Sequence, residues 1–216
     1  MKIYKYPRTF HLPWSRGATS DDKMLKNTSC FDGKTVVITE KMDGENSTLA
    51  RDYYHARSLN SNDHPSRSWI KQLHSWIAGG IPEGWRISGE NVYARHSIAY
   101  DNLKSYFYCF SIWDENNYCL SWKDTVEWCR LLEIEHVPVL ENEIEWEYVF
   151  FDKNHWTVGF EPSPNQEGYV VRNADRFHYD DFSTNVAKWV RKNHVQTDQH
   201  WMHEKVVPNK LIKTAI

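Results

Sequence analysis

The chain has 216 residues, of which 40% are hydrophobic and 25% are charged, with a formal net charge of -3. These values fit one soluble globular domain and exclude low-complexity and strongly basic proteins, so nucleic acid would have to bind a local basic patch. No apolar run is long enough for a signal peptide or a membrane span. The cysteines, Cys30, Cys109, Cys119 and Cys129, form no CxxC pair, so we expect reduced thiols and a cytoplasmic protein.

The first half of the chain begins with a loop-rich segment and then alternates short strands with one helix. Within the loop-rich segment, residues 11–22 suit either a loop that wraps a phosphate or RNA end or an ordered surface loop. Apolar residues at helical spacing predict a helix over residues 67–77, ended by a Gly-Gly-Ile-Pro sequence. Strands are predicted over residues 35–40, 47–50, 53–56 and 85–93, the second and third forming a hairpin.

The second half mixes strands and helices without a βαβ rhythm, which favours an α+β fold with largely antiparallel sheets. A hairpin is predicted over residues 106–122 with its turn at 115–117, followed by a helix over 123–132. Residues 141–160 are predicted as a short helix or irregular piece, and residues 194–216 as polar and partly loose. The remaining predicted strands cover residues 136–140, 167–173 and 186–190.

Lys41 stands at the end of a β-branched strand, and Asp43 and Gly44 follow it at once. An isolated lysine at a turn is usually only solvated. Three further charged residues, Glu90, Glu167 and Lys188, also lie in apolar strand sequences, where a charge is costly unless it has a partner or a function. Together the four residues indicate a site built from several strands.

The order of these motifs resembles that of the covalent nucleotidyltransferases, the polynucleotide ligases and RNA capping enzymes. The matching sequences are KMDG at 41–44, GE at 89–90, YFYCF at 106–110, EGYVV at 167–171 and VAK at 186–188. Within that superfamily the chain most resembles the bacteriophage-type RNA ligases that seal nicks in duplex RNA. The sequences EKMDGEN, FYCFSI and QEGYVV carry this closer resemblance.

The resemblance implies an α+β nucleotidyltransferase domain, with two packed antiparallel sheets and flanking helices around a central ATP cleft. It implies an ATP-dependent RNA ligase that uses Mg²⁺ or Mn²⁺, forms a lysyl-adenylate, passes AMP to a 5′-phosphate RNA end and seals it to a 3′-hydroxyl. Such a lysine must lose its proton to attack, and nearby cations such as Lys188, Arg57 and a divalent metal are expected to lower its pKa. A separate end-healing kinase or phosphatase is a candidate partner, and the protein is expected to be a monomer.

The resemblance also implies roles for individual residues. Lys41 is the nucleophile, and Asp43 orients it or holds a metal-bound water. Glu167 positions the metal through water, with Glu90 as the second metal-site carboxylate, and Lys188 contacts the α-phosphate. These are the expected catalytic and metal-binding residues.

Five side chains are expected to bind the nucleotide besides Lys41, Glu167 and Lys188. Glu90 accepts from the ribose hydroxyls, and Phe110 stacks on adenine, unless the neighbouring Phe107 or Tyr108 does so. Glu40 contacts the adenine edge. Asn46 supports adenylate transfer, and Arg57 touches the nucleotide or the RNA end.

Two departures from the family pattern stand out. The last motif usually carries a second lysine, which here is Val190, with Arg191 or Lys192 as substitutes. The chain is expected to be a single adenylation domain, residues 1–216, without the separate C-terminal RNA-binding domain of full ligases. The alternatives are a DNA ligase, a GTP-using capping enzyme, or a non-catalytic module that binds nucleic-acid ends.

Overall fold

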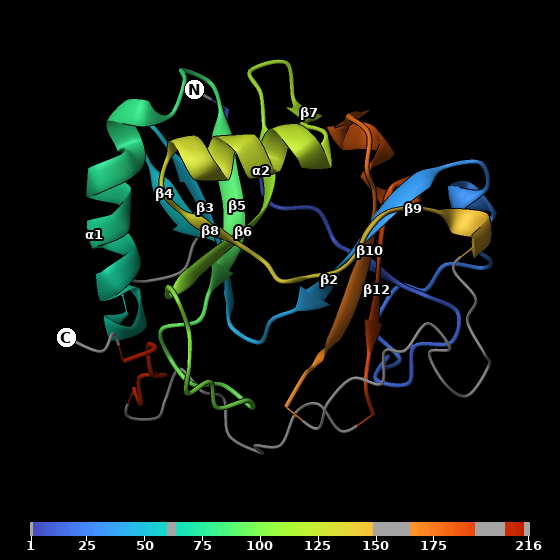
Figure 1. Cartoon of the computed structure of the whole chain (residues 1–216), viewed down its shortest axis with the longest axis horizontal. Helices are drawn as coiled ribbons and strands as arrows, with labels where there is room; N and C mark the ends of the chain where they lie inside the picture. The colour runs from blue at the N-terminus through green and yellow to red at the C-terminus, as the bar shows by residue number, and fades with distance from the viewer. Residues whose placement is uncertain (1, 60–63, 149–164, 193–205, 214–216) are drawn as a thin grey trace.

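The computed structural model describes residues 2–59, 64–148, 165–192 and 206–213. The described chain forms two β-sheets, two α-helices and several short 3-10 helices (Figure 1). The α-helices are α1 (Ser68–Ile77) and α2 (Trp122–Leu131), and the longer strands are β2 (Thr35–Lys41), β3 (Glu45–Ala50), β5 (Arg86–Asn91), β6 (Phe107–Trp113), β9 (Val139–Glu145), β10 (Gly168–Asn173) and β12 (Val186–Val190). The short strands are β1 (Phe10–His11), β4 (Tyr54–Ala56), β7 (Tyr118–Cys119), β8 (Glu135–His136) and β11 (Phe177–His178).

The first sheet has the strand order β1-β12-β10-β2-β9. Its β2, β10 and β12 pair antiparallel, whereas β1 pairs parallel with β12. Its outer face packs on residues of the N-terminal segment, including Leu12 and Phe31, and on Trp146. The sheet therefore joins strands from both ends of the described chain, which brings Lys41 and Lys188 into one layer.

The second sheet has the order β11-β7-β6-β5-β3-β4, with β8 pairing parallel to β6. Helices α1 and α2 lie against it (Figure 1), because α1 turns an apolar stripe of Ile70, Leu73 and Ile77 toward Leu49, Ile87 and other buried residues of the sheet. Neither α-helix of the described ranges has the length and apolarity needed to cross a bilayer.

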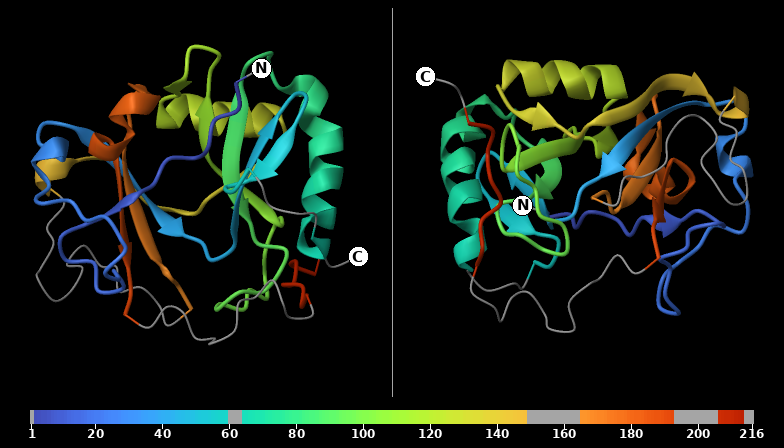
Figure 2. Two further views of the ribbon diagram at one scale, coloured as in Figure 1. Left: turned by 180° about the vertical axis from the view of Figure 1, so that it is seen from behind. Right: turned by 60° about the horizontal axis from the view of Figure 1, so that its bottom comes forward.

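The two sheets face each other across two apolar clusters. One cluster joins Val37 and Met42 of the first sheet region to Tyr108 of the second. The other joins Val186 to Trp113 and Cys119. Both views in Figure 2 place the sheets on either side of a central region, and the cavity described below lies between these clusters.

The expected α+β class with largely antiparallel sheets is confirmed, with two short parallel pairs added. The prediction for residues 141–160 is wrong at its start, because β9 continues to Glu145 as an edge strand beside β2 before a 3-10 helix at Trp146–Tyr148. The exposed carboxylates of this strand, Glu143 and Glu145, interrupt its apolar pattern, so the sequence did not indicate a strand there. The rest of that prediction and most of the predicted loose tail fall outside the described residues.

Candidate functional site

A cavity of about 480 Å³ lies between the two sheets. Strands β2, β3, β5, β6, β10 and β12 contribute to its wall, together with residues of the N-terminal segment. Seven of the nine residues singled out in the sequence line it, namely Glu40, Lys41, Asn46, Arg57, Glu90, Phe110 and Lys188. Asp43 and Glu167 stand beside Lys41 but do not form part of the lining.

Lys41 is held by a carboxylate from a distant part of the chain. Its Nζ donates to Glu167 Oε2 at 2.5 Å, and the two side chains are 24% and 8% exposed. The sheet register explains the contact, because Lys41 pairs with Gly168, the residue after Glu167. A Cβ at Gly168 would lie 2.0 Å from the Trp189 carbonyl oxygen, so only glycine allows this close strand pairing.

The pKa of Lys41 is raised, which corrects the expectation that neighbouring cations lower it. Burial acts to lower this pKa, but Glu167, Glu90 and Asp43 together outweigh burial. Three carboxylates around one amine stabilise its protonated form. In the free chain Lys41 is therefore a charged ammonium.

The Asp43 side chain holds the backbone of residues 97 and 98 beside the turn that follows Lys41. Its Oδ2 accepts from the backbone N–H groups of Ser97 and Ile98, each at 2.8 Å. Position 44 requires glycine for a steric reason, because a Cβ there would lie 2.5 Å from the Asn91 carbonyl oxygen. The turn after Lys41 is thus pinned against the end of β5, while the Asp43 charge still acts on the lysine.

Glu90 lies on β5 directly opposite Asn46 of β3. Its Oε1 accepts from the Gly44 backbone N–H at 3.1 Å. Burial raises the pKa of Glu90 to about 8; Lys41 opposes the shift, and the negative charges of Glu167 and Asp43 add to it. Near pH 7 the free chain therefore keeps a proton on most Glu90 carboxyls, and a cation bound there has to displace that proton.

Phe110 lies in a β-bulge of β6. Ser88 pairs with Ser111 and Gly89 pairs with Cys109, so Phe110 is the extra residue between two paired positions. Its carbonyl oxygen accepts from Arg172 Nη1 at 3.2 Å. The two alternatives are placed elsewhere, because Phe107 is fully buried under α1 and the Tyr108 hydroxyl accepts from the Lys104 backbone at 2.9 Å. The half-buried Phe110 is the ring that borders the cavity.

Glu40 borders the cavity at the end of β2, one residue before Lys41. Its backbone pairs with that of Tyr169. Its carboxylate accepts from Gln166 Nε2 at 3.4 Å, and burial raises its pKa. The contact of Glu40 with the adenine edge stays a prediction.

Asn46 and Arg57 meet at the start of the β3–β4 hairpin. The Arg57 backbone N–H donates to the Asn46 carbonyl oxygen at 2.9 Å, and the Arg57 side chain is exposed at the cavity mouth. Asn46 Oδ1 is buried and has no hydrogen-bond donor among the described residues. A buried acceptor without a donor costs about 1–3 kcal/mol, so this oxygen is prepared for a ligand.

Lys188 lies on β12, where it pairs with Val170 of β10 and with His11 of β1. It is two residues along the sheet from the row that contains Lys41 and Gly168. Burial lowers the pKa of Lys188, Lys41 lowers it further, and Asp22 opposes both. His11 Nδ1 lies 2.7 Å from Ser15 Oγ, and burial lowers the pKa of His11 to about 4. The histidine beside Lys188 is therefore neutral near pH 7.

Val190 lies on the same face as Lys188, as the alternation predicts, and is 1% exposed. Its backbone N–H donates to Ser15 Oγ at 3.0 Å, and its carbonyl oxygen accepts from the Gly17 backbone at 2.7 Å. The loop 15–17 thus covers the position of the missing second lysine.

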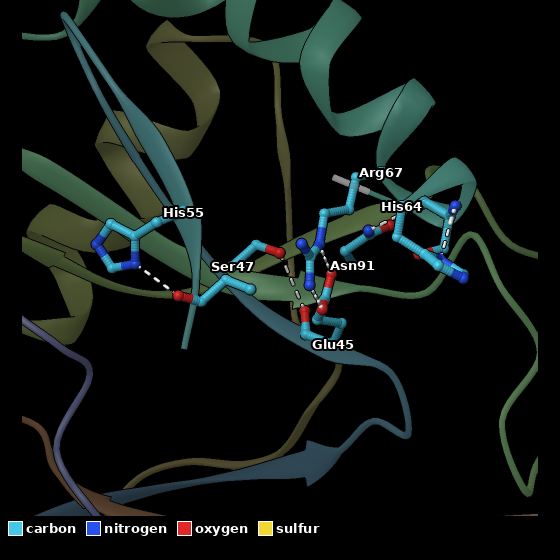
Figure 3. A network of polar contacts seen from close by, with 8 residues as sticks. Glu45, Ser47, His55, His64, Arg67 and Asn91 are labelled. Carbon is cyan, nitrogen blue, oxygen red and sulfur yellow. Dashed lines mark hydrogen bonds and ion pairs between the residues drawn. The ribbon is translucent and has the colours of Figure 1, made fainter. Parts of the chain in front are cut away.

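Several residues of the cavity escaped the sequence analysis. Arg67, at the start of α1, makes a two-pronged contact with Glu45, with Nε donating to Oε2 at 2.8 Å and Nη2 donating to Oε1 (Figure 3). His96 follows β5, and burial lowers its pKa. Tyr6, Arg8 and Asp22 come from the N-terminal segment. No local pattern marks these residues, because each meets the site only through tertiary contacts.

The acidic groups of the site fit a hard divalent cation, which prefers carboxylate oxygens and Mg²⁺ in particular keeps several waters. Asp43, Glu90 and Glu167 all act on the charge of Lys41. The described residues contain no group of three or more side chains placed to hold a metal directly. A cation here would therefore be bound by one or two carboxylates and by water.

Residues 34–190 match the model of a protein family described as RNA ligase. A structure of Naegleria gruberi RNA ligase with pyrophosphate is similar at a TM-score of 0.50 and 16% identity, covering 88% of this chain and 61% of that one. A mutant form with AMP and Mn gives 0.51 and 16%, covering 88% and 62%. At this identity the two structures show a shared fold.

The comparison with curated protein sequences gives no match. The chain spans 50–63% of the length of the Naegleria ligase chains. The lower value comes from a mutant form with ATP and Mn at a TM-score of 0.47 and 18% identity, and that match covers 74% of this chain. The closer likeness to the bacteriophage branch is not tested by these matches. The family match extends from the residue before β2 to the last residue of β12, and it shows that the chain belongs to the RNA ligase family.

Proposed function

We propose that this protein is an ATP-dependent RNA ligase that carries AMP on Lys41. The observation that carries the proposal is the position of the Lys41 amine, held by Glu167 in a cavity shared with Glu90, Phe110 and Lys188. The Naegleria ligase structures with AMP and Mn are consistent with an adenine nucleotide and a divalent cation as its ligands.

In the first step the Lys41 nitrogen attacks the α-phosphorus of ATP. A nitrogen–phosphorus bond forms, the bond from the α-phosphorus to the bridging oxygen breaks, and pyrophosphate leaves. The adenylate then passes to a 5′-phosphate RNA end, and a 3′-hydroxyl displaces AMP to leave a phosphodiester. Lys188, whose strand lies beside that of Glu167, is placed to stabilise charge on the phosphate.

The proton on Lys41 is the obstacle to attack. Because the neighbouring carboxylates raise its pKa, the free chain keeps the amine charged. Glu90 and Glu167 would hold a divalent cation together with water, and the cation would supply positive charge that offsets these carboxylates and polarises the phosphate. Asn46, with its unsatisfied oxygen, and Arg57 are placed at the mouth for the nucleotide or the RNA end.

Self-labelling tests the proposal. The protein is incubated with α-³²P-labelled ATP or GTP and Mg²⁺ or Mn²⁺, and labelled protein is separated on a denaturing gel. We expect a label from ATP that acid removes and that Lys41→Ala abolishes. Lys123→Ala, which changes an exposed lysine on α2, is the matched control and keeps the label.

The products distinguish the alternatives. Sealing of a nicked RNA duplex with a 5′-phosphate and a 3′-hydroxyl supports the RNA ligase, whereas sealing of nicked DNA alone assigns a DNA ligase. A stronger label from GTP assigns a capping-type enzyme. An unlabelled protein that still binds nucleic-acid ends is a binding module and contradicts the proposal.

A further inference from the structure

The N-terminal segment lies outside the family match, yet it forms part of the cavity wall. It is anchored at both sheets. Tyr4 packs over the Arg86 guanidinium of β5 at 4.7 Å, and the Leu12 backbone N–H donates to the Lys188 carbonyl oxygen at 2.8 Å. Figure 2 shows the segment, in dark blue, crossing from one sheet to the other. Between the anchors, residues 6–9 border the cavity.

Tyr6 is the aromatic residue of this crossing. Its ring centroid lies 4.9 Å from that of Phe110 at an interplanar angle of 65°, and 5.2 Å from that of Phe182 at 82°. Such edge-to-face distances mean direct ring contact. Tyr6 is therefore fixed against the ring that is expected to stack on the base, and no base fits between Tyr6 and Phe110.

The Tyr6 hydroxyl points toward polar groups at the base end of the cavity. It lies close to Ser111, the residue after Phe110, and burial raises the pKa of the phenol so that it stays neutral. Ser111 Oγ in turn accepts from Trp113 Nε1 at 3.0 Å. The position of the Tyr6 side chain is thus set by its contacts with two rings, Phe110 and Phe182.

We propose that Tyr6 is a specificity-determining residue whose ring forms the side wall of the nucleobase site. The inference rests on the proposed function, and it gives the base end of the cavity a side wall from a segment outside the family match. A base stacked on Phe110 meets the Tyr6 ring at its edge. The wall admits an unsubstituted purine and excludes one with a large substituent.

A bulky analogue, N6-benzyl-ATP labelled at the α-phosphate, measures this limit. The wild-type protein is expected to use ATP at least about 100-fold faster than the analogue in single-turnover adenylation. Tyr6→Ala is expected to reduce that ratio by at least about tenfold, the scale on which a pocket discriminates by a few carbon atoms. Tyr6→Phe, which keeps the ring, is expected to leave the ratio unchanged.

Trp76→Ala is the control, because it removes an exposed aromatic ring of α1 that lies outside the cavity. Tyr6→Leu provides a second test of the wall if the alanine variant does not fold, as judged by circular dichroism. An unchanged ratio in folded Tyr6→Ala or Tyr6→Leu overturns the inference. Faster adenylation with ATP itself in these variants also overturns it, since the ring would then block the site.

The two proposals fail in different ways. If the wild-type protein forms no adduct with any nucleotide, the proposed function fails. If it labels itself with ATP but accepts the analogue equally well, only the role of Tyr6 fails.

Discussion

Replacing Glu90 by glutamine should make the protein less sensitive to alkaline pH. The folded chain keeps a proton on Glu90 up to a pKa of about 8, whereas the ordinary value is 4.5. Between these values the folded state binds a proton that the unfolded state has lost. The free energy of unfolding therefore falls as the pH rises through this window. Glutamine keeps an oxygen to accept from the Gly44 backbone N–H and removes the titration.

The structure sets the size of this effect. Each pH unit in the window changes the free energy of unfolding by about 1.4 kcal/mol, so the full interval sets a ceiling of about 5 kcal/mol. The Glu90 carboxyl is partly exposed to the cavity, and solvent there screens the interactions with its neighbours. We therefore expect Glu90→Gln to exceed the wild type by about 1–3 kcal/mol at pH 9 and to match it near pH 5.

Urea denaturation followed by circular dichroism between pH 5 and pH 9 measures the difference. Glu83→Gln, which removes an exposed carboxylate outside the cavity, controls for the loss of one negative charge. A Glu90→Gln advantage that is constant with pH, or that grows toward pH 5, would refute the reasoning. The same titration predicts that divalent cations bind more tightly as the pH rises toward 8, because protons compete for the carboxylate.

Four further substitutions, in three experiments, test the other parts of the site. Lys188→Ala should slow single-turnover adenylation by a factor of roughly 10²–10³. Lys192→Ala, which changes an exposed residue just beyond β12, should mainly weaken RNA binding and flatten its salt dependence. The opposite result would mean that the phosphate contact is assigned to the wrong lysine. Arg67→Ala should lower the free energy of unfolding by about 3–5 kcal/mol, because it leaves the Glu45 carboxylate unpaired in a largely buried pair, and a loss below about 1 kcal/mol would contradict this. Gly168→Ala should prevent tight pairing of β10 and β12 and reduce both thermal stability and adenylation, and wild-type behaviour in both measurements would count against the close approach.

Much of the site follows from the sequence, because a strand fixes the faces of its residues locally. The alternation of side chains along a strand follows from backbone geometry alone. It correctly places Val190 on the face of Lys188. The predicted strands that end beside Lys41 and begin at Glu167 correspond to β2 and β10, which pair with each other at those ends. The motif spacing also predicts the α+β class and the family, since both depend on local patterns in chain order.

The tertiary structure decides what those patterns leave open. The pairing of β2 with β10 brings Glu167 to Lys41, and the pairing of β5 with β6 places Glu90 and Phe110 in the wall of the same cavity. The raised pKa of Lys41 arises from carboxylates 2 to 126 residues distant in the chain, with Glu167 the farthest. Such contacts depend on which strands become neighbours, and burial in a region of low dielectric constant then strengthens the electrostatic interactions between these groups.

The position of the N-terminal segment is likewise decided by the tertiary structure and not by local sequence. Its sequence allowed either a phosphate loop or a surface loop, and no spacing rule linked Tyr6 to a ring more than 100 residues away. Pairing of β1 with β12 and packing of Tyr4 on β5 stretch the segment across the cavity. A local pattern cannot encode that crossing, because it exists only once two distant strands have paired and fixed both of its ends.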